Sequence, residues 1–140
     1  MPDGIPTPSV IPYLLYKDPA RIRDFLVEAL SFTEVATHRS PEGEVGNIAL
    51  RMGDKFVMLS RAQPDMGLAA PGDLPAVHAG TMVYVADVDA HYHRAKSAGA
   101  TIWYEPADMP YGQREYGVRD PENGFWCFGT FLPGSGLSPG

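Results

Sequence analysis

The sequence predicts an α+β fold of two tandem βαβββ modules, whose eight strands form a curved, half-open barrel with one helix outside each module. The main observation is an internal repeat: residues 11–61 align with residues 80–130 at one constant offset, without a gap (87 − 18 = 69). A repeat of this length indicates two supersecondary units packed into one core. A second observation is the Pro-, Gly- and Ala-rich stretch 62–79, a linker between the copies. The identical pairs are Asp18 and Asp87, Ala29 and Ala98, Pro41 and Pro110, Gly43 and Gly112, and Phe56 and Phe125.

The first module, residues 9–61, is expected to contain a strand, a helix and three further strands. Residues 10–16 are apolar and aromatic, which is typical of a buried strand. Asp18 and Pro19 predict the start of a helix, because an Asp side chain accepts hydrogen bonds from free amide groups and Pro fits the first helical position. Apolar residues then recur at helical spacing to Ser31. Strands are expected over 32–38, 45–52 and 55–61, with turns at 40–43 and 53–54.

The second module, residues 80–132, is expected to repeat this order within the same single domain. A strand is predicted over 81–86 and a helix over 87–97, with Gly99 as the C-terminal cap of that helix. The tail, residues 133–140, is expected to be loose. Further strands are expected over 101–105, where Pro106 ends the strand, and over 113–119 and 125–130.

Composition excludes several classes of protein. With 140 residues, of which 44% are apolar, the chain is long enough for one domain with a real core. The net charge of −6 and the absence of a basic run argue against nucleic-acid and anionic-membrane partners. A single cysteine, Cys127, excludes an internal disulfide framework. The chain starts without a signal-peptide pattern and has no apolar run of membrane-spanning length, so we expect a cytoplasmic protein.

Segments of the second module carry a family resemblance. Residues 83–89 read Val-Tyr-Val-Ala-Asp-Val-Asp and lead into a helix that ends Ala-Gly-Ala at 98–100. Residues 110–114 read Pro-Tyr-Gly-Gln-Arg, and residues 120–126 read Asp-Pro-Glu-Asn-Gly-Phe-Trp. With the doubled βαβββ unit, these segments resemble the vicinal oxygen chelate superfamily of glyoxalases, bleomycin-resistance proteins and extradiol dioxygenases. The resemblance covers residues 10–132 and implies the fold, which hosts many unrelated activities.

The resemblance also implies four positions that bind a metal in the metalloenzymes of the family. Here those positions hold Ile11, Met58, Gly80 and Cys127. Catalytic divalent ions prefer imidazole and carboxylate ligands, and Ile and Gly side chains offer no ligand at all. We therefore expect no metal at the usual place of the family, and no other cofactor.

The four histidines do not replace the missing ligands. His91 and His93 are two apart on a predicted helix, so they point to different faces. His38 lies late in a strand. His78 lies two residues before Gly80 and is the remaining candidate for a displaced metal. The alternative interpretation of His78 is a solvated residue of the linker.

Strand alternation predicts an apolar and aromatic cavity between the modules. The four ligand-equivalent positions are taken to face inward, so Trp126 and Phe128 should face the helices. Arg114 and Tyr116 overlay Val45 and Asn47, which are taken to face away from the core. Such a lining suits a flat aromatic ligand better than a charged metabolite, although aromatics on strands often serve packing alone. The predicted ligand-binding residues are Tyr13, Leu15, Phe56, Met58, Met82, Tyr84, Arg114, Tyr116 and Cys127.

Two functions from different classes follow. The first is a metal-independent small-molecule-binding protein of the bleomycin-resistance type, which sequesters an aromatic natural product. The second is an enzyme of the lyase, isomerase or dioxygenase type, which uses a displaced metal or side-chain acid–base groups. Cys127 could be a nucleophile, but no base or cation accompanies it in the sequence, so a buried small apolar residue is the favoured interpretation. We also expect a homodimer, since edge strands and a half-open cavity favour a partner.

Overall fold

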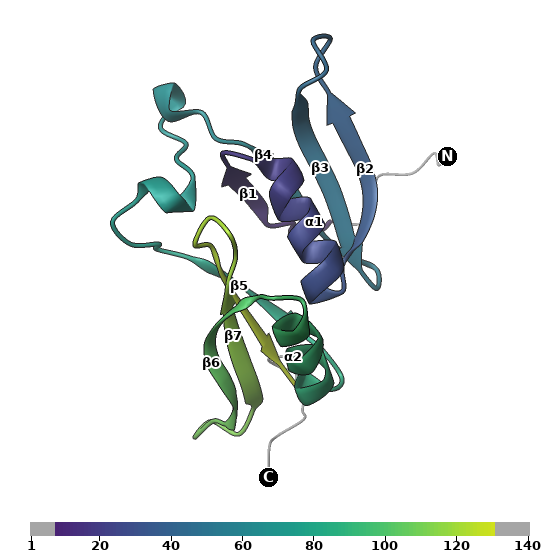
Figure 1. Ribbon diagram of the computed structural model, residues 1–140, viewed down its shortest axis with the longest axis vertical. Helices are drawn as coiled ribbons and strands as arrows, with labels where there is room; N and C mark the ends of the chain where they lie inside the picture. The colour runs from purple at the N-terminus through teal and green to yellow at the C-terminus, as the bar shows by residue number, and fades with distance from the viewer. Residues whose placement is uncertain (1–7, 131–140) are drawn as a thin grey trace.

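The computed structural model describes residues 8–130 and confirms the α+β class. Its strands form two separate four-stranded sheets, in the orders β1-β4-β3-β2 and β5-β8-β7-β6, rather than one eight-stranded sheet (Figure 1). In each sheet the first pair of strands, β1 with β4 and β5 with β8, is parallel and the others are antiparallel. The elements are β1 (Tyr13–Tyr16), α1 (Pro19–Leu30), β2 (Thr33–Arg39), β3 (Val45–Met52), β4 (Lys55–Arg61), β5 (Gly80–Tyr84), α2 (Val88–Ser97), β6 (Thr101–Asp108), β7 (Arg114–Arg119) and β8 (Phe125–Gly129).

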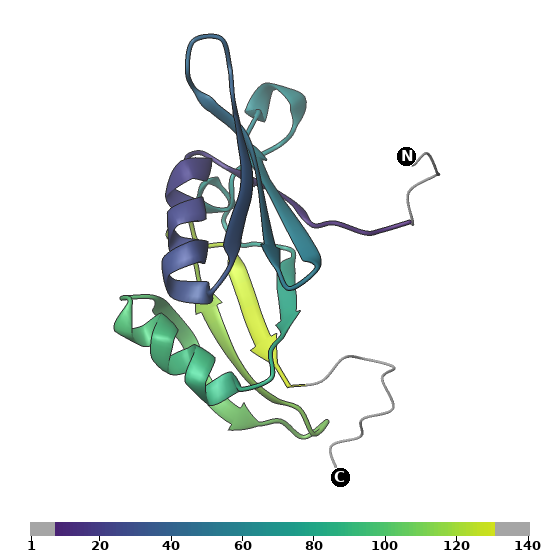
Figure 2. The ribbon, with the colours of Figure 1, turned by 90° about the vertical axis from the view of Figure 1, so that its right-hand side faces the viewer.

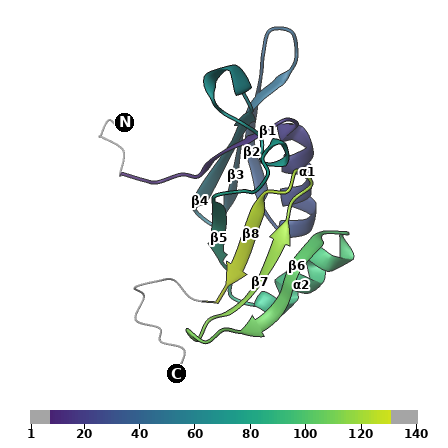
Figure 3. The ribbon, with the colours of Figure 1, turned by 90° about the vertical axis from the view of Figure 1, so that its left-hand side faces the viewer.

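Both helices lie on the same side of the sheets (Figures 2 and 3). The core fills the space between the helices and the sheets, and Trp126 and Phe128 are buried in it, as alternation predicted. The face of each sheet that carries no helix is called the open face below. Within the described residues, no helix is long and apolar enough to cross a membrane.

Both helices begin at the predicted aspartates. Asp18 Oδ1 accepts a hydrogen bond from the amide of Arg21 at 3.2 Å, and Asp87 Oδ1 accepts one from the amide of Ala90 at 3.0 Å. Each bond satisfies an amide that has no partner inside the helix. The sequence therefore sets the position at which each helix starts.

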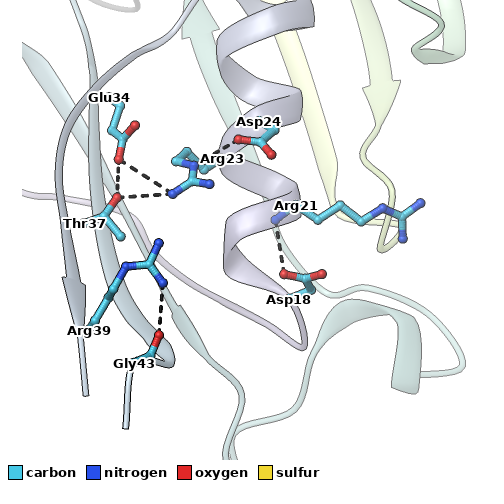
Figure 4. A network of polar contacts seen from close by, with 8 residues as sticks. All are labelled: Asp18, Arg21, Arg23, Asp24, Glu34, Thr37, Arg39 and Gly43. Atoms are coloured by element: carbon cyan, nitrogen blue, oxygen red, sulfur yellow. Dashed lines mark hydrogen bonds and ion pairs between the residues drawn. The ribbon is translucent and has the colours of Figure 1, made fainter. Parts of the chain in front are cut away.

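A polar network ties α1 to the neighbouring strand β2 (Figure 4). Arg23 Nη1 lies 3.4 Å from Thr37 Oγ1 and 3.8 Å from Glu34 Oε2, while its Nε donates to Asp24 at 3.0 Å. Thr37 in turn donates to Glu34. Arg23 thus links its own helix to a strand that pairs with only one neighbour.

The two helices meet at the C-terminal end of α1. A carbonyl can only accept, so His91 Nε2 carries the proton and donates to the carbonyl of Leu30 at 2.9 Å. In the neutral ring His91 Nδ1 is then an acceptor, and it accepts from the Tyr116 hydroxyl at 2.6 Å. Burial lowers the pKa of His91, which fits this neutral tautomer. Arg94 donates to the carbonyls of Val27 and Glu28, so groups of α2 satisfy the last turn of α1.

The turn before β8 joins the second sheet to the first. Asp120 Oδ1 accepts from the amides of Glu122 and Gly124, at 3.0 and 2.8 Å. The Glu122 carboxylate then accepts from the amides of Lys17 and Asp18, both at 2.8 Å. The junction between β1 and α1 is thereby fixed by a side chain more than a hundred residues away.

Several element boundaries differ from the predictions, most of them by one or two residues. The first strand begins at Tyr13, and the stretch 62–79 contains two short 3-10 turns, Pro64–Met66 and Pro71–Asp73. β6 continues past Pro106 to Asp108, because it is an edge strand with a bulge between Tyr104 and Ala107, where a missing amide hydrogen costs nothing. The predicted loose tail, residues 133–140, lies outside the described residues.

Candidate functional site

The open face of the second sheet is organised in three rows across β5, β8 and β7. Strand pairing aligns Gly80 with Phe125 and Arg119, then Met82 with Cys127 and Gly117, then Tyr84 with Gly129 and Glu115. Tyr104 of β6 pairs with Gly117 and extends the middle row. The outer members Met82 and Tyr84 are 49% and 42% exposed, so the β5 edge of this face presents apolar and aromatic side chains to solvent.

Each row contains a glycine, and the side chain of a nearby residue covers the space that a Cβ on that glycine would occupy. A Cβ on Gly80 would lie 2.3 Å from the Phe125 ring, one on Gly117 would lie 2.4 Å from the Tyr104 ring, and one on Gly129 would lie 2.3 Å from the Gln113 side chain. These side chains therefore rest directly on the backbone of the sheet. The result is a level surface floored by rings and an amide, which we call the shelf.

Glu115 is a buried carboxylate at one end of the shelf. It is 4% exposed and accepts hydrogen bonds from the hydroxyls of Tyr104 and Tyr111 and from Gln113 Nε2. Burial alone would raise the pKa of Glu115, but the three donors outweigh it and hold the pKa below its usual value. Glu115 is therefore a charged group, and most of its acceptor capacity is already used.

Arg119 lies at the other end of the shelf, against two aromatic rings. Its guanidinium carbon is 4.1 Å from the centroid of the Trp103 ring and 5.3 Å from that of Phe125. Trp103 is 56% exposed, so one side of this stack is in solvent. The shelf therefore carries a negative group at one end and a positive group at the other.

The open face of the first sheet has the same rows with different side chains. Tyr13 pairs with Met58 and Leu15 with Ser60, while Phe56 pairs with Arg51. The Tyr13 hydroxyl lies 3.4 Å from Asn47 Oδ1, a weak bond on a ring that is 55% exposed. The alternation of β1, β4, β5 and β8 thus places Tyr13, Leu15, Phe56, Met58, Met82, Tyr84 and Cys127 on the open faces.

Two cavities flank the edge strands β1 and β5. The larger, about 790 Å³, lies along β5 and is lined by Phe56, Met82 and Tyr84 together with Phe32 and Val85. The smaller, about 300 Å³, lies between β1 and the start of β5, and Tyr13, Leu15 and His78 are among its lining residues. Both volumes are in the range of small-molecule sites.

The predicted inward positions of Arg114 and Tyr116 are wrong. Tyr116 is fully buried on the helix side, where it stacks on Phe128 at 5.3 Å and bonds to His91. Arg114 donates through Nε and Nη2 to Asp89 of α2, both at 2.9 Å, and this pairing lowers the pKa of Asp89. Neither side chain reaches the open face.

A bulge explains the error. In the first sheet His38 pairs with Asn47 and Arg39 pairs with Val45, so Gly46 is an extra residue in β3. β7 has no such residue, because Asp108 pairs with Arg114 and Ala107 with Glu115. Beyond the bulge, the true offset between β3 and β7 is therefore one less than the repeat suggests (118 − 50 = 68). With this offset Glu115 and Arg119, rather than Tyr116, lie on the open face.

Cys127 lies in the middle row of the shelf but is poorly suited to be a nucleophile. Its Sγ lies 3.5 Å from Met82 Sδ, and no cation contacts it among the described residues. Burial, and then the charge of Glu115, raises the pKa of the Cys127 thiol to about 11. Its neighbour is thus a carboxylate that opposes ionisation, rather than a base that assists it.

The positions of the family metal do not present a suitable donor set. Met58 and Cys127 occupy equivalent places in the two sheets, and with Ile11 and Gly80 they supply two sulfur atoms and no imidazole or carboxylate. Within residues 8–130, no three His, Cys, Asp or Glu side chains gather as a metal site.

Sequence reasoning missed Glu115, Arg119, Trp103 and Tyr104 as residues of the open face. Two signals were present in the sequence: Gly46, a residue type that favours bulges, and the longer turn before β8 than before β4. Gly46 adds one residue to the first module, and the longer turn before β8 adds one residue to the second module at a different place. The ends of the repeat therefore align without a gap, while the third strands do not.

Comparisons with known proteins match nearly the whole chain. The model of the glyoxalase/bleomycin resistance protein/dioxygenase superfamily matches residues 10–128. The uncharacterized protein Mb0911c of Mycobacterium bovis is 34% identical over 126 residues, which are 87% of this chain and 82% of that protein. Among solved structures, TioX from Micromonospora sp. ML1 is 31% identical, with a TM-score of 0.70 over 90% of this chain and 100% of its own. TnmS3 from Streptomyces sp. CB03234, an antibiotic binding protein, is 21% identical, with a TM-score of 0.65 over 91% and 100%.

Proposed function

Because the chain belongs to the glyoxalase/bleomycin resistance protein/dioxygenase superfamily, we propose that it is a binding protein which sequesters a flat, aromatic small molecule. The observation that carries the proposal is the shelf, where rings lie flat over Gly80 and Gly117 and exposed side chains such as Met82 and Tyr84 stand at its edge. A planar ligand can stack on such a surface without displacing core side chains. TnmS3, an antibiotic binding protein of the same fold, supports a small-molecule ligand.

Binding is proposed to need no metal. The ligand-equivalent residues Ile11, Met58, Gly80 and Cys127 do not offer the nitrogen and oxygen donors that divalent ions prefer. Affinity would come instead from burial of apolar ligand surface, which stabilises a complex by about 25 cal/mol per Å² before the costs of association are subtracted.

An acid–base enzyme is the weaker proposal. Glu115 is the buried carboxylate of the shelf, and a general base needs a free lone pair within reach of the substrate. Its oxygen atoms already accept from Tyr104, Tyr111 and Gln113, and these bonds make it a weaker base. Cys127, with its raised pKa, is no better placed for nucleophilic chemistry.

We further propose that the protein works as a homodimer. Exposed large apolar side chains gather on the open faces and at the ends of β1, which include Ile11, Tyr13, Met82, Tyr84 and Trp103. A surface of this kind is usually covered by a partner or a ligand. Light scattering at micromolar concentration tests this proposal, and a mass of about 15 kDa would contradict it.

The binding proposal is tested by titrating the purified protein with planar aromatic compounds, such as anthraquinones, in a calorimeter. Tyr84→Ala should weaken binding by about tenfold or more, since stacking on a tyrosine adds about 0.5–1.5 kcal/mol to the area it buries. Tyr92→Phe, a change on the helix side, is the matched control and should bind as the wild type does. Absence of binding across a panel of such compounds would contradict the proposal, and so would one metal ion per chain on which binding depends.

A further inference from the structure

Arg119 is a cation without an acidic partner in the described part of the chain. Its Nη1 donates to the carbonyl of Asn123 at 3.2 Å, while its Nε is buried with no hydrogen-bond partner. Arg114, on the same strand, is different, since all three of its nitrogen atoms donate to Asp89 or Asp108. The Arg119 side chain is half-buried, and a buried guanidinium nitrogen without a hydrogen-bond partner is rare in proteins.

Two aromatic rings hold Arg119 in place without cancelling its charge. Trp103 and Phe125 lie at 4.1 and 5.3 Å from its guanidinium carbon, distances at which ring faces attract a cation. A carboxylate partner would have neutralised the side chain, whereas the rings leave it available to an anion. They also keep water away from one side of the guanidinium, which strengthens any charge-assisted hydrogen bond it makes.

The nearest carboxylate on the same face does not compensate Arg119. Glu115 lies four residues away along β7, roughly 13 Å at the usual rise of a strand. Its oxygen atoms accept from Tyr104, Tyr111 and Gln113. Between the two charges lie Gly117 and the Tyr104 ring that covers it. The flat surface between the two charges is therefore about as long as a fused-ring molecule. The Glu115 carboxylate at one end has hydrogen-bond donors from the protein, whereas Arg119 at the other end has a nitrogen atom without a partner.

We infer that Arg119 binds the carboxylate of the aromatic ligand, so that the ligand of the shelf is a planar aromatic acid. The inference rests on the proposed small-molecule function and narrows it to one chemical class. The ring system would lie over Tyr104 and Cys127, and the carboxylate would take the free N–H groups of Arg119, a geometry that a planar guanidinium favours.

The test compares anthraquinone-2-carboxylate with its neutral methyl ester, by calorimetry on the full chain at neutral pH. The acid should bind the wild type about tenfold to a hundredfold more tightly than the ester, because a hydrogen bond to a charged group is worth about 1.5–3 kcal/mol. Arg119→Gln should remove this preference, so that the acid and the ester bind the variant equally tightly. Arg114→Gln alters the opposite face of the same strand and should keep the preference.

The outcomes separate this inference from the proposed function. If the wild type binds acid and ester equally well, the role of Arg119 is wrong and the binding function stands. If neither compound binds, and no other compound of the planar aromatic panel binds either, both the inference and the proposed function are wrong. If Arg114→Gln removes the preference as fully as Arg119→Gln does, a general loss of positive charge explains the result and the inference is wrong. Should Arg119→Gln not fold, Arg119→Lys must give a reduced preference, and an unchanged preference would overturn the inference.

Discussion

The hydroxyl of Tyr16, at the end of β1, lies 2.5 Å from Oδ2 of Asp120, which also accepts from Trp126 Nε1 at 2.9 Å. Tyr16 belongs to the first sheet, Asp120 lies in the turn between β7 and β8, and Trp126 belongs to the second sheet; all three are buried. Burial and the neighbouring carboxylate raise the pKa of Tyr16, so the phenol keeps its proton and donates it. This bond joins the two halves of the molecule inside the core.

Tyr16→Phe should destabilise the protein by about 1–3 kcal/mol, because it removes one of the donors to a buried carboxylate oxygen. Urea unfolding measures the change. Tyr92→Phe is the control: the Tyr92 hydroxyl donates to Glu105, an exposed carboxylate that water can serve instead, so its loss should cost less than about 1 kcal/mol. An equal loss of unfolding free energy in the two variants would mean that the bond between Tyr16 and Asp120 stabilises the protein no more than the exposed bond between Tyr92 and Glu105.

Trp126→Ala should destabilise the fold by about 3–5 kcal/mol, the usual range for removal of a large buried aromatic side chain. Trp126 is 1% exposed and packs edge-on against Phe32 at 5.7 Å. Tyr13→Ala should cost less than about 1 kcal/mol, since that ring is 55% exposed. Thermal melting compares the two variants. A larger loss for Tyr13→Ala would show that the helix face and the open face have been exchanged.

The pH dependence of stability should contain a contribution from Glu115. Its pKa in the folded protein is below the ordinary value of 4.5, so its stabilising effect is present above that pH and is lost as the pH falls through the folded pKa. Glu115→Gln should therefore destabilise the protein most at neutral pH, and the difference from the wild type should shrink between about pH 5 and about pH 3. Urea titrations across this range measure it. A difference between Glu115→Gln and the wild type that stays constant across this range would refute the account.

The thiol of Cys127 should react slowly in the folded protein. With a pKa of about 11 it is almost entirely protonated at pH 8, so iodoacetamide should modify it on the order of a hundredfold more slowly than in urea. Mass spectrometry follows the reaction without ambiguity, because the chain has a single cysteine. Rapid labelling of the folded protein at pH 8 would contradict the raised pKa and would revive the nucleophile hypothesis.

The sequence predicts most of the fold because local patterns and the repeat agree. Asp18 and Asp87 start the helices by side-chain capping, which depends only on neighbouring residues. The faces of β1, β4, β5 and β8 follow from alternation. β7 fails because the face of a strand changes with every residue of register, so the single extra residue at Gly46 is enough to reverse it.

The charged ends of the shelf could not be predicted for a related reason. The contact of Arg119 with Trp103 joins two strands across an irregularity of β6, where the register shifts between Ile102 and Tyr104. Propensity and periodicity describe single strands, and they do not specify which residue of a bulged edge strand lies beside its neighbour. Pairing between strands decides this contact, and it emerges only from the assembled sheet.

The glycine floor of the shelf has a consequence for the divergence of such proteins. Phe125 and Tyr104 lie flat only because Gly80 and Gly117 carry no side chain, and both contacts are on the face away from the core. A single alanine at either position would force the ring above it to rise, which would turn a level surface into a ridged one while Trp126 and its neighbours stay in place. The contour of the binding surface can therefore change in single steps, one glycine at a time, although at Gly117 the step also disturbs the hydrogen bond from Tyr104 to Glu115. A lineage could in this way adapt to new ligands rapidly.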